Sequence, residues 1–150
     1  MNIVAIIQAR MDSSRFPSKM RAILGNLSII EWVILRVKKA KFLDKIVLAT
    51  SNEDQDNYLV DIANKYEIQS YRGSKLNVLK RMVEAASQHE ADHVVRICAD
   101  NPFICFDALD NLIEYYKQSK CDLAFNHSPL FDSDFADGFP SRKIKNWFNS

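Results

Sequence analysis

The sequence contains very little glycine, with only Gly25, Gly73 and Gly138 among its 150 residues. Three glycines at these spacings leave no room for a G-x-G-x-x-G fingerprint or a Walker A loop, the two commonest glycine-based phosphate cradles. A phosphate site in this chain would therefore have to rely on cationic side chains and a metal ion.

Cysteine, net charge and long apolar runs are scarce too. Cys98, Cys105 and Cys121 have no C-x-x-C spacing, and the three histidines do not accompany them at zinc-site spacing, so we expect reduced, buried cysteines in a cytoplasmic protein. No apolar run approaches the roughly twenty residues of a membrane span. Because the chain enters a predicted strand at once, we expect no signal peptide. A formal net charge of +1 gives no reason to expect nucleic-acid binding.

The chain begins instead with an apolar run that leads directly into a basic loop. Ile3 to Ile7 predict a strand buried on both faces of a parallel sheet. The next segment, from Ala9 to Arg21, holds one acid, Asp12, among several cations and hydroxyls, which are Arg10, Ser13, Ser14, Arg15, Lys19 and Arg21. Ligands of open α/β sheets bind beyond the carboxyl ends of the strands. We therefore expect a polyanion such as a nucleoside triphosphate here; the alternative is a solvated surface loop.

Strands and helices are predicted to alternate along the rest of the chain. The predicted strands cover residues 46–49, 68–71, 93–97 and 121–125. The predicted helices follow Ser28 as an N-cap with Glu31 in a capping box, then cover residues 53–66 and 76–89, and finally 108–118 with Asp107 as the cap. This alternation with short connections indicates a single α/β domain over residues 1–150, with three αβα layers and a mostly parallel sheet.

A second candidate site follows the predicted strand 93–97. Asp100 comes directly after that strand, and Asn101-Pro102 keeps its carboxylate in an irregular loop. Mg²⁺ commonly takes one or two protein carboxylates and completes its shell with water and phosphate oxygens. The alternative is that Asp100 caps a helix or forms a turn.

Several spaced identities resemble one enzyme family. Ala9-Arg10-x-x-Ser13-Ser14-Arg15-x-Pro17-x-Lys19 resembles the A-R-x-x-S-[ST]-R-x-P-G-K signature of cytidylyltransferases that make CMP-activated sugar acids, in the branch that includes spore-coat polysaccharide and acylneuraminate enzymes. Residues 99–104 are similar to the family's G-D-x-P-[LF]-I loop, whose Asp holds Mg²⁺. Residues 71–81 resemble its Y-R-G-S-x-x-x-V-L-x-R stretch beside the nucleotide.

The resemblance implies a Rossmann-like fold of the nucleotide-diphospho-sugar transferase type and transfer of CMP from CTP to an acidic sugar, with release of pyrophosphate. It implies catalytic roles for Arg10, Lys19 and Asp100, with Asp100 as the Mg²⁺ ligand. The nucleotide-binding set that it implies is Ala9, Arg10, Ser13, Ser14, Arg15, Lys19, Arg72, Ser74 and Arg81. For Arg81, the alternative is an exposed helical arginine. A homodimer is left open.

The sequence departs from the family pattern at several positions. Asp12 stands where this branch often has glycine, and it would repel phosphates unless it points away or pairs with Arg10 or Arg15. Pro140 and Arg142 stand where two further metal-binding acids are expected, and we expect the chain to lack the family's later strands and dimerisation arm. The alternatives are therefore a catalytically impaired nucleotide-binding remnant or partner protein, and a glycosyltransferase that uses a nucleotide-sugar donor. Residues 143–147 are predicted to form an amphipathic turn.

Overall fold

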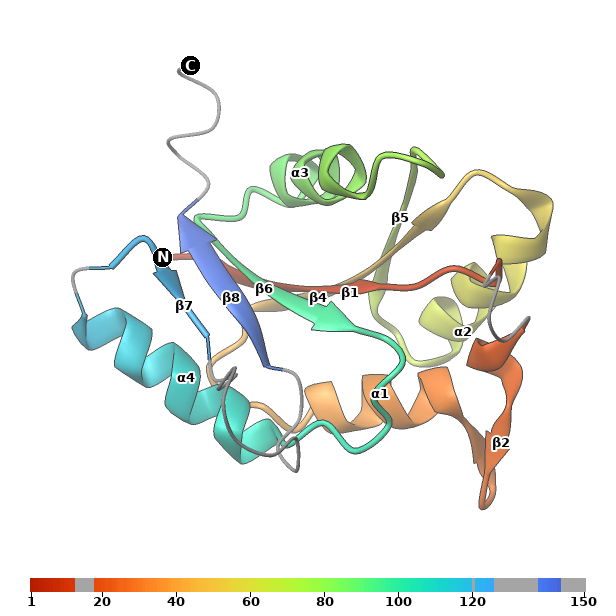
Figure 1. Ribbon diagram of the computed structural model, residues 1–150, viewed down its shortest axis with the longest axis horizontal. Helices are drawn as coiled ribbons and strands as arrows, with labels where there is room; N and C mark the ends of the chain where they lie inside the picture. The colour runs from red at the N-terminus through yellow and green to blue at the C-terminus, as the bar shows by residue number, and fades with distance from the viewer. Residues whose placement is uncertain (13–17, 120, 126–137, 144–150) are drawn as a thin grey trace, which may run out of the picture.

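A mostly parallel, twisted sheet with helices on both faces forms the protein in the computed structural model (Figure 1). The structure describes residues 1–12, 18–119, 121–125 and the backbone of 138–143. The strands of the main sheet are β1 (Ile3–Gln8), β4 (Lys45–Ser51), β5 (Gln69–Gly73), β6 (His93–Cys98), β7 (Leu123–Ala124) and β8 (Gly138–Lys143). The helices are α1 (Ile29–Val37), α2 (Asn57–Lys65), α3 (Val78–Gln88) and α4 (Phe106–Gln118), with short 3₁₀ turns η1 (Lys19–Arg21) and η2 (Asp54–Asp56). The predicted α/β fold class is confirmed.

The strand order in the main sheet is β5-β4-β1-β6-β8-β7. β1 lies between β4 and β6 and is parallel to both, whereas β8 is antiparallel to β6 and to β7. Two residues of β8, Phe139 and Pro140, lie opposite the single residue Arg96 of β6, so the pairing is interrupted there. A bulge suits this position because proline has no N–H to donate to a neighbouring strand.

The core lies on both sides of β1. Ile3, Ala5 and Ile7 belong to one buried cluster with residues of α1, α2 and α4. Val4 and Ile6 belong to a second cluster, in which Ala85 and Ala86 of α3 cover the other face. β1 is therefore buried on both faces, as its continuous apolar run predicts for a central parallel strand.

A small hairpin connects the basic loop to α1. Strands β2 (Ile23–Leu24) and β3 (Leu27–Ser28) pair antiparallel, with Gly25 at a φ of 70° in the turn between them. The predicted capping box then starts α1, because the Glu31 carboxylate accepts the Ser28 N–H at 2.8 Å. The cap predicted for α4 was wrong by two residues: Cys105 is the N-cap, and Asp107 lies in the first turn.

Three other sequence expectations have different outcomes. None of the three cysteines is in a disulfide, but they are half-buried and not buried as expected, because each lies near the end of a strand or helix. The predicted turn at residues 143–147 lies outside the described residues except for Lys143, whose backbone belongs to β8. In the part of the chain that the structure describes, no helix has the length and apolar character needed to cross a membrane.

Candidate functional site

The carboxyl ends of three neighbouring strands bring distant parts of the chain together. Gln8 of β1 pairs in register with Ala49 of β4 and with Cys98 of β6. One residue further on, the Ala9 N–H donates to the Ala49 carbonyl oxygen at 3.2 Å, and the Ala99 N–H donates to the Gln8 carbonyl oxygen at 3.3 Å. The loops after β1 and β6 therefore leave the sheet side by side, as the sequence predicts.

A hollow of about 330 Å³ lies between these two loops. The described residues that line it are Gln8, Ala9, Arg10, Asp12, Lys19, Met20, Arg96, Cys98, Ala99 and Asp100. This set holds three cations and two acids, so three less two leaves a net charge of +1. The Lys19 ammonium lies 3.7 Å from the Asp100 carboxylate, with the two side chains 34% and 57% exposed. The two predicted sites are thus one site with accessible charges of both signs.

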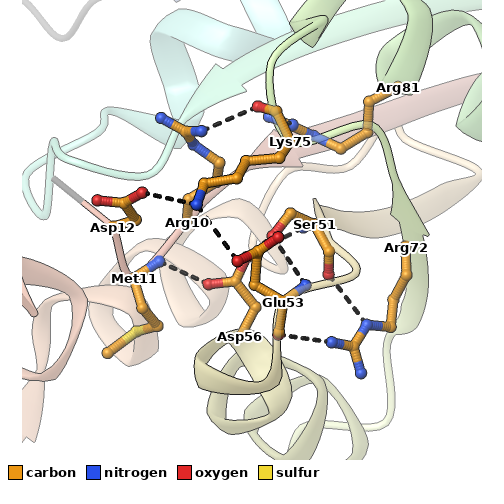
Figure 2. A network of polar contacts seen from close by, with 9 residues as sticks. All are labelled: Arg10, Met11, Asp12, Ser51, Glu53, Asp56, Arg72, Lys75 and Arg81. Carbon is orange, nitrogen blue, oxygen red and sulfur yellow. Dashed lines mark hydrogen bonds and ion pairs between the residues drawn. The ribbon is translucent and has the colours of Figure 1, made fainter.

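Arg10 is fixed at the inner end of the basic loop. Its backbone directly follows the buried residue Ala9, and its Nη1 donates to the Lys75 carbonyl oxygen at 2.9 Å (Figure 2). Lys75 lies between β5 and α3, so this bond joins loops that are 65 residues apart in the sequence. The other predicted members of the loop, Ser13, Ser14 and Arg15, lie outside the described residues.

Asp12 is paired with a cation that the sequence did not indicate. Its carboxylate lies 3.2 Å from the Lys75 ammonium, which also lies 3.3 Å from the Glu53 carboxylate (Figure 2). Hydrogen bonds to Asp12 and then to Glu53 raise the pKa of Lys75. Pairing with Arg10, one of the two expected partners, is therefore corrected to pairing with Lys75; Arg15 lies outside the described residues.

The guanidinium of Arg72 joins β5 to the segment after β4. Nε donates to the Ser51 carbonyl oxygen at 3.0 Å, and Nη2 donates to the Glu53 carbonyl oxygen at 2.8 Å. Ser74 accepts the Asn77 N–H at 3.0 Å, just before α3 begins. These contacts give both residues structural roles in the free protein, and their predicted contacts with a nucleotide stay predictions.

Arg81 is not the exposed helical arginine that was its alternative role. It is 0% exposed, and its Nη1 donates to the Ser74 carbonyl oxygen. Burial is the main cause that lowers the pKa of Arg81, with the nearby charge of Arg10 adding to it. Arg81 therefore supports the loop before α3 from inside the protein, and its predicted nucleotide contact is untested.

Sequence reasoning did not identify Asp56, Lys75 or Arg96 as site residues. Arg96 lies in β6, two residues before its end, and lines the hollow, with Nη2 at 3.4 Å from the Gln8 side-chain oxygen. The alternation of side chains along a strand could have identified Arg96, because it is the charged residue within a mostly apolar strand that ends at the site. Asp56 and Lys75 act through contacts with residues far away in the sequence, so no local pattern marks them.

Among the described acids, Asp100 is the candidate metal ligand at the hollow. Among residues 1–12, 18–119 and 121–125, no group of three or more His, Cys, Asp or Glu side chains is placed to hold a metal ion. Asp100 is nevertheless a carboxylate with an exposed side chain at the rim of the hollow. One such ligand fits Mg²⁺ bound jointly with phosphate, because substrate oxygens and water complete its shell.

Comparison with known proteins identifies relatives over most of the chain. A family described as cytidylyltransferase matches residues 4–137. The Methanocaldococcus jannaschii protein MJ1063 is 37% identical over 81% of this chain and 50% of its own length. The spore coat polysaccharide biosynthesis protein SpsF of Bacillus subtilis is 31% identical over 83% of this chain and 53% of its own length. A 3-deoxy-manno-octulosonate cytidylyltransferase of Acaryochloris marina is 30% identical over 91% of this chain and 56% of its own length.

A solved structure agrees with these relatives. A cytidylyltransferase from Leptospira borgpetersenii superposes with a TM-score of 0.87 at 27% identity, covering 99% of this chain and 63% of the other. The chain spans about half the length of the curated relatives that it matches. The similarity thus includes both strands that end at the hollow, β1 and β6.

Proposed function

Since the chain belongs to the cytidylyltransferase family, we propose that it binds CTP in the hollow between the loops after β1 and β6 and transfers CMP to an acidic sugar. The observation that carries this proposal is the meeting of Arg10 and Lys19 with Asp100 in one hollow. Cations for a triphosphate and a carboxylate for its metal come there from segments about 80 or more residues apart. The general reaction of the family is CMP transfer from CTP.

The acceptor class rests on the relatives. One is named for 3-deoxy-manno-octulosonate, which is an acidic sugar, and another for spore-coat polysaccharide biosynthesis. We therefore propose an acidic sugar as the acceptor and surface polysaccharide biosynthesis as the setting, in the cytoplasm where nucleoside triphosphates are available. These assignments are proposals, because the chain spans only about half of each relative.

In the proposed reaction, an acceptor hydroxyl attacks the α-phosphorus of CTP. A new oxygen–phosphorus bond forms, the bond from the α-phosphorus to the bridging oxygen breaks, and pyrophosphate leaves with the electron pair. The hydroxyl proton passes to solvent. Positioning and charge stabilisation supply most of the catalysis in phosphoryl chemistry of this kind. Arg10 and Lys19 supply positive charge to the β- and γ-phosphates, and the Arg10 fork suits paired oxygens.

Mg²⁺ is the metal that we propose, with Asp100 as its protein ligand. When bound, the ion would neutralise phosphate charge. In the free protein, the carboxylate of Asp100 is paired with Lys19, so this contact has to open before the metal ligand and the phosphate ligand are both available.

One observation favours a second candidate, a nucleotide-binding protein with impaired catalysis. Pro140 and Arg142 occupy the positions where the family resemblance places two further acids. A missing charge-stabilising group typically costs on the order of 10²–10³ in rate, while binding of the nucleotide can persist. CTP binding without pyrophosphate release would favour this candidate.

The test is thermal unfolding with CTP and Mg²⁺. At 100 times its dissociation constant, a ligand stabilises by about 2.7 kcal/mol, which raises the Tm of a domain of this size by about 5–10 °C. The double variant Arg10→Ala with Lys19→Ala should fold but lose this rise. The matched control is Lys39→Ala with Lys41→Ala, two exposed cations between α1 and β4 that do not line the hollow, and it should keep the rise. An unchanged rise in the first double variant would remove the triphosphate role of the loop.

Pyrophosphate release separates the two candidates. The wild-type protein is incubated with CTP, Mg²⁺ and 3-deoxy-manno-octulosonate or N-acetylneuraminate, and released pyrophosphate is measured. Release that requires both CTP and the acidic sugar supports the transferase. A CTP-dependent Tm rise with no release, for either sugar, favours the impaired nucleotide-binding protein.

A further inference from the structure

A buried carboxylate contacts the first residues of the basic loop. Asp56, at the end of η2, is 1% exposed. Its Oδ1 accepts the Met11 N–H at 2.8 Å, and its Oδ2 accepts the Ser51 N–H at 3.1 Å as well as the Ser51 hydroxyl (Figure 2). One side chain thus joins the first residues after β1 to the last residue of β4.

The carboxylate is held in its charged form. Burial by itself raises the pKa of Asp56, but hydrogen bonds from Ser51 and Met11 outweigh it and keep the pKa below its ordinary value. The charge also favours the protonated state of Arg81, the fully buried arginine near Arg10. Asp56 therefore supplies both hydrogen bonds and a countercharge within this network.

Met11 lies between the charged residues Arg10 and Asp12. On one side, Arg10 donates to the Lys75 carbonyl oxygen at 2.9 Å. On the other, the Asp12 carboxylate lies 3.2 Å from the Lys75 ammonium. The position of the Met11 amide restricts where the backbone atoms of Arg10 and Asp12 lie, because the chain has only two soft dihedral angles per residue. A shift of the Met11 amide would therefore displace the starting points of both side chains that contact Lys75.

We propose that Asp56 is a positioning residue for the triphosphate site, which it serves by holding the Met11 amide, and that it does not touch the nucleotide. This inference rests on the proposed function, since it assumes that Arg10 binds phosphate. It adds a residue that lies outside the hollow and outside the sequence motifs of the loop.

In Asp56→Asn, the loss of charge and the loss of the positioning contact should change the affinity for CTP in opposite directions. This substitution keeps the shape of the side chain and removes one negative charge near a polyanion site. By Coulomb's law alone, CTP would then bind more tightly. An Asn side chain, however, has one oxygen and one NH₂ group, so it cannot accept from both the Met11 N–H and the Ser51 N–H. If position dominates, CTP binds about tenfold more weakly or worse.

Two matched variants separate these effects. Asp110→Asn removes another buried acid that accepts backbone N–H groups, from Lys41 at 2.8 Å and Phe42 at 3.2 Å, and that does not line the hollow. It should lower Tm but leave the dissociation constant of CTP within about twofold, since the site is untouched. Asp12→Asn removes an acid that lines the hollow, and it should tighten CTP binding.

Titration calorimetry with CTP measures all three variants. Weaker binding in Asp56→Asn, with unchanged binding in Asp110→Asn, supports the positioning role. In an Arg10→Ala background, Asp56→Asn should have little further effect, because the side chain that it positions is gone. Equal or tighter CTP binding in Asp56→Asn overturns the proposal.

Hydrogen exchange on the wild-type protein covers the case in which Asp56→Asn fails to fold. The Met11 amide should exchange slowly in the free protein, because it donates to a buried carboxylate. Exchange as fast as that of an exposed amide would overturn the proposal without any variant. If the wild type binds no CTP, the proposed function fails; a protected Met11 amide would then still show the contact, but no role in binding.

Discussion

Asp100→Asn is the substitution that tests most directly how the hollow binds the metal ion and the phosphates of CTP. It keeps the shape of the side chain and removes its charge. In the free protein, the Asp100 carboxylate lies 3.7 Å from the Lys19 ammonium, and both side chains are partly exposed. The substitution thus releases Lys19 from its partner and, at the same time, removes the proposed metal ligand.

The size of the first effect follows from the exposure of the pair. With side chains 34% and 57% exposed, the pair belongs among surface ion pairs, which contribute about 0–1 kcal/mol. Releasing Lys19 can therefore tighten metal-free CTP binding by at most about fivefold. The second effect is larger, because Asp100 is the only proposed protein ligand. We expect the gain in affinity that Mg²⁺ gives to CTP to fall by about tenfold or more, which is about 1.4 kcal/mol.

Titration calorimetry with CTP, with and without Mg²⁺, measures both effects in one set of experiments. The expected pattern is equal or slightly tighter binding without metal and clearly weaker binding with metal. The control is Asp122→Asn, an acid that lies outside the lining of the hollow and should leave both values unchanged. If the metal dependence of Asp100→Asn equals that of the wild type, Asp100 is a turn residue and the reasoning about the metal is refuted.

Two predictions concern the stability of the scaffold. Burial raises the pKa of Glu31, but hydrogen bonds from Lys65, Ser28 and Tyr66 outweigh it and lower the pKa from 4.5 to about 2. Because the folded-state pKa lies below the unfolded one, this stabilisation, up to about 3 kcal/mol, is present above pH 4.5 and is lost as pH falls towards 2. In urea unfolding, the free energy of unfolding should fall less over that pH range in Glu31→Gln than in the wild type. An equal fall in both proteins would contradict this prediction. Gly73→Ala would place a Cβ 2.7 Å from Tyr71 Cε1 and 3.2 Å from Arg81 Cγ, so we expect a loss of about 1–3 kcal/mol in urea unfolding. Unchanged stability would mean that the Tyr71 ring moves aside at little cost.

The sequence was sufficient for the strands that carry the site. The run from Ile3 to Ile7 is apolar without alternation, and strands of that kind are buried in the middle of parallel sheets. The run before Asp100 is mostly apolar, with Arg96 as its charged member. These two strands, each ending in a charged loop, were enough to place both loops at the carboxyl edge. The capping box at Ser28 and Glu31 was equally local, since its two members are three residues apart.

The contacts that organise the site could not be predicted in the same way. Lys75 pairs with an acid 63 residues before it, and Asp56 holds an amide 45 residues before it. Neither residue stands out in its own segment, where a lysine before a helix and an acid in a helix start are common. Their importance comes from the order of β5, β4 and β1 in the sheet, which brings three loops into contact.

The two proposed phosphate ligands differ in how firmly the free protein holds them. The Arg10 guanidinium donates to a backbone carbonyl oxygen, and the neighbouring amide is fixed by a buried carboxylate. Lys19 has only an accessible carboxylate at 3.7 Å as its described ion-pair partner. Ordering a long side chain costs conformational entropy, and a side chain already held in place has less to lose on binding. If both bind phosphate, Arg10 therefore presents a nearly formed contact, while Lys19 exchanges one anion for another when the nucleotide and its metal arrive.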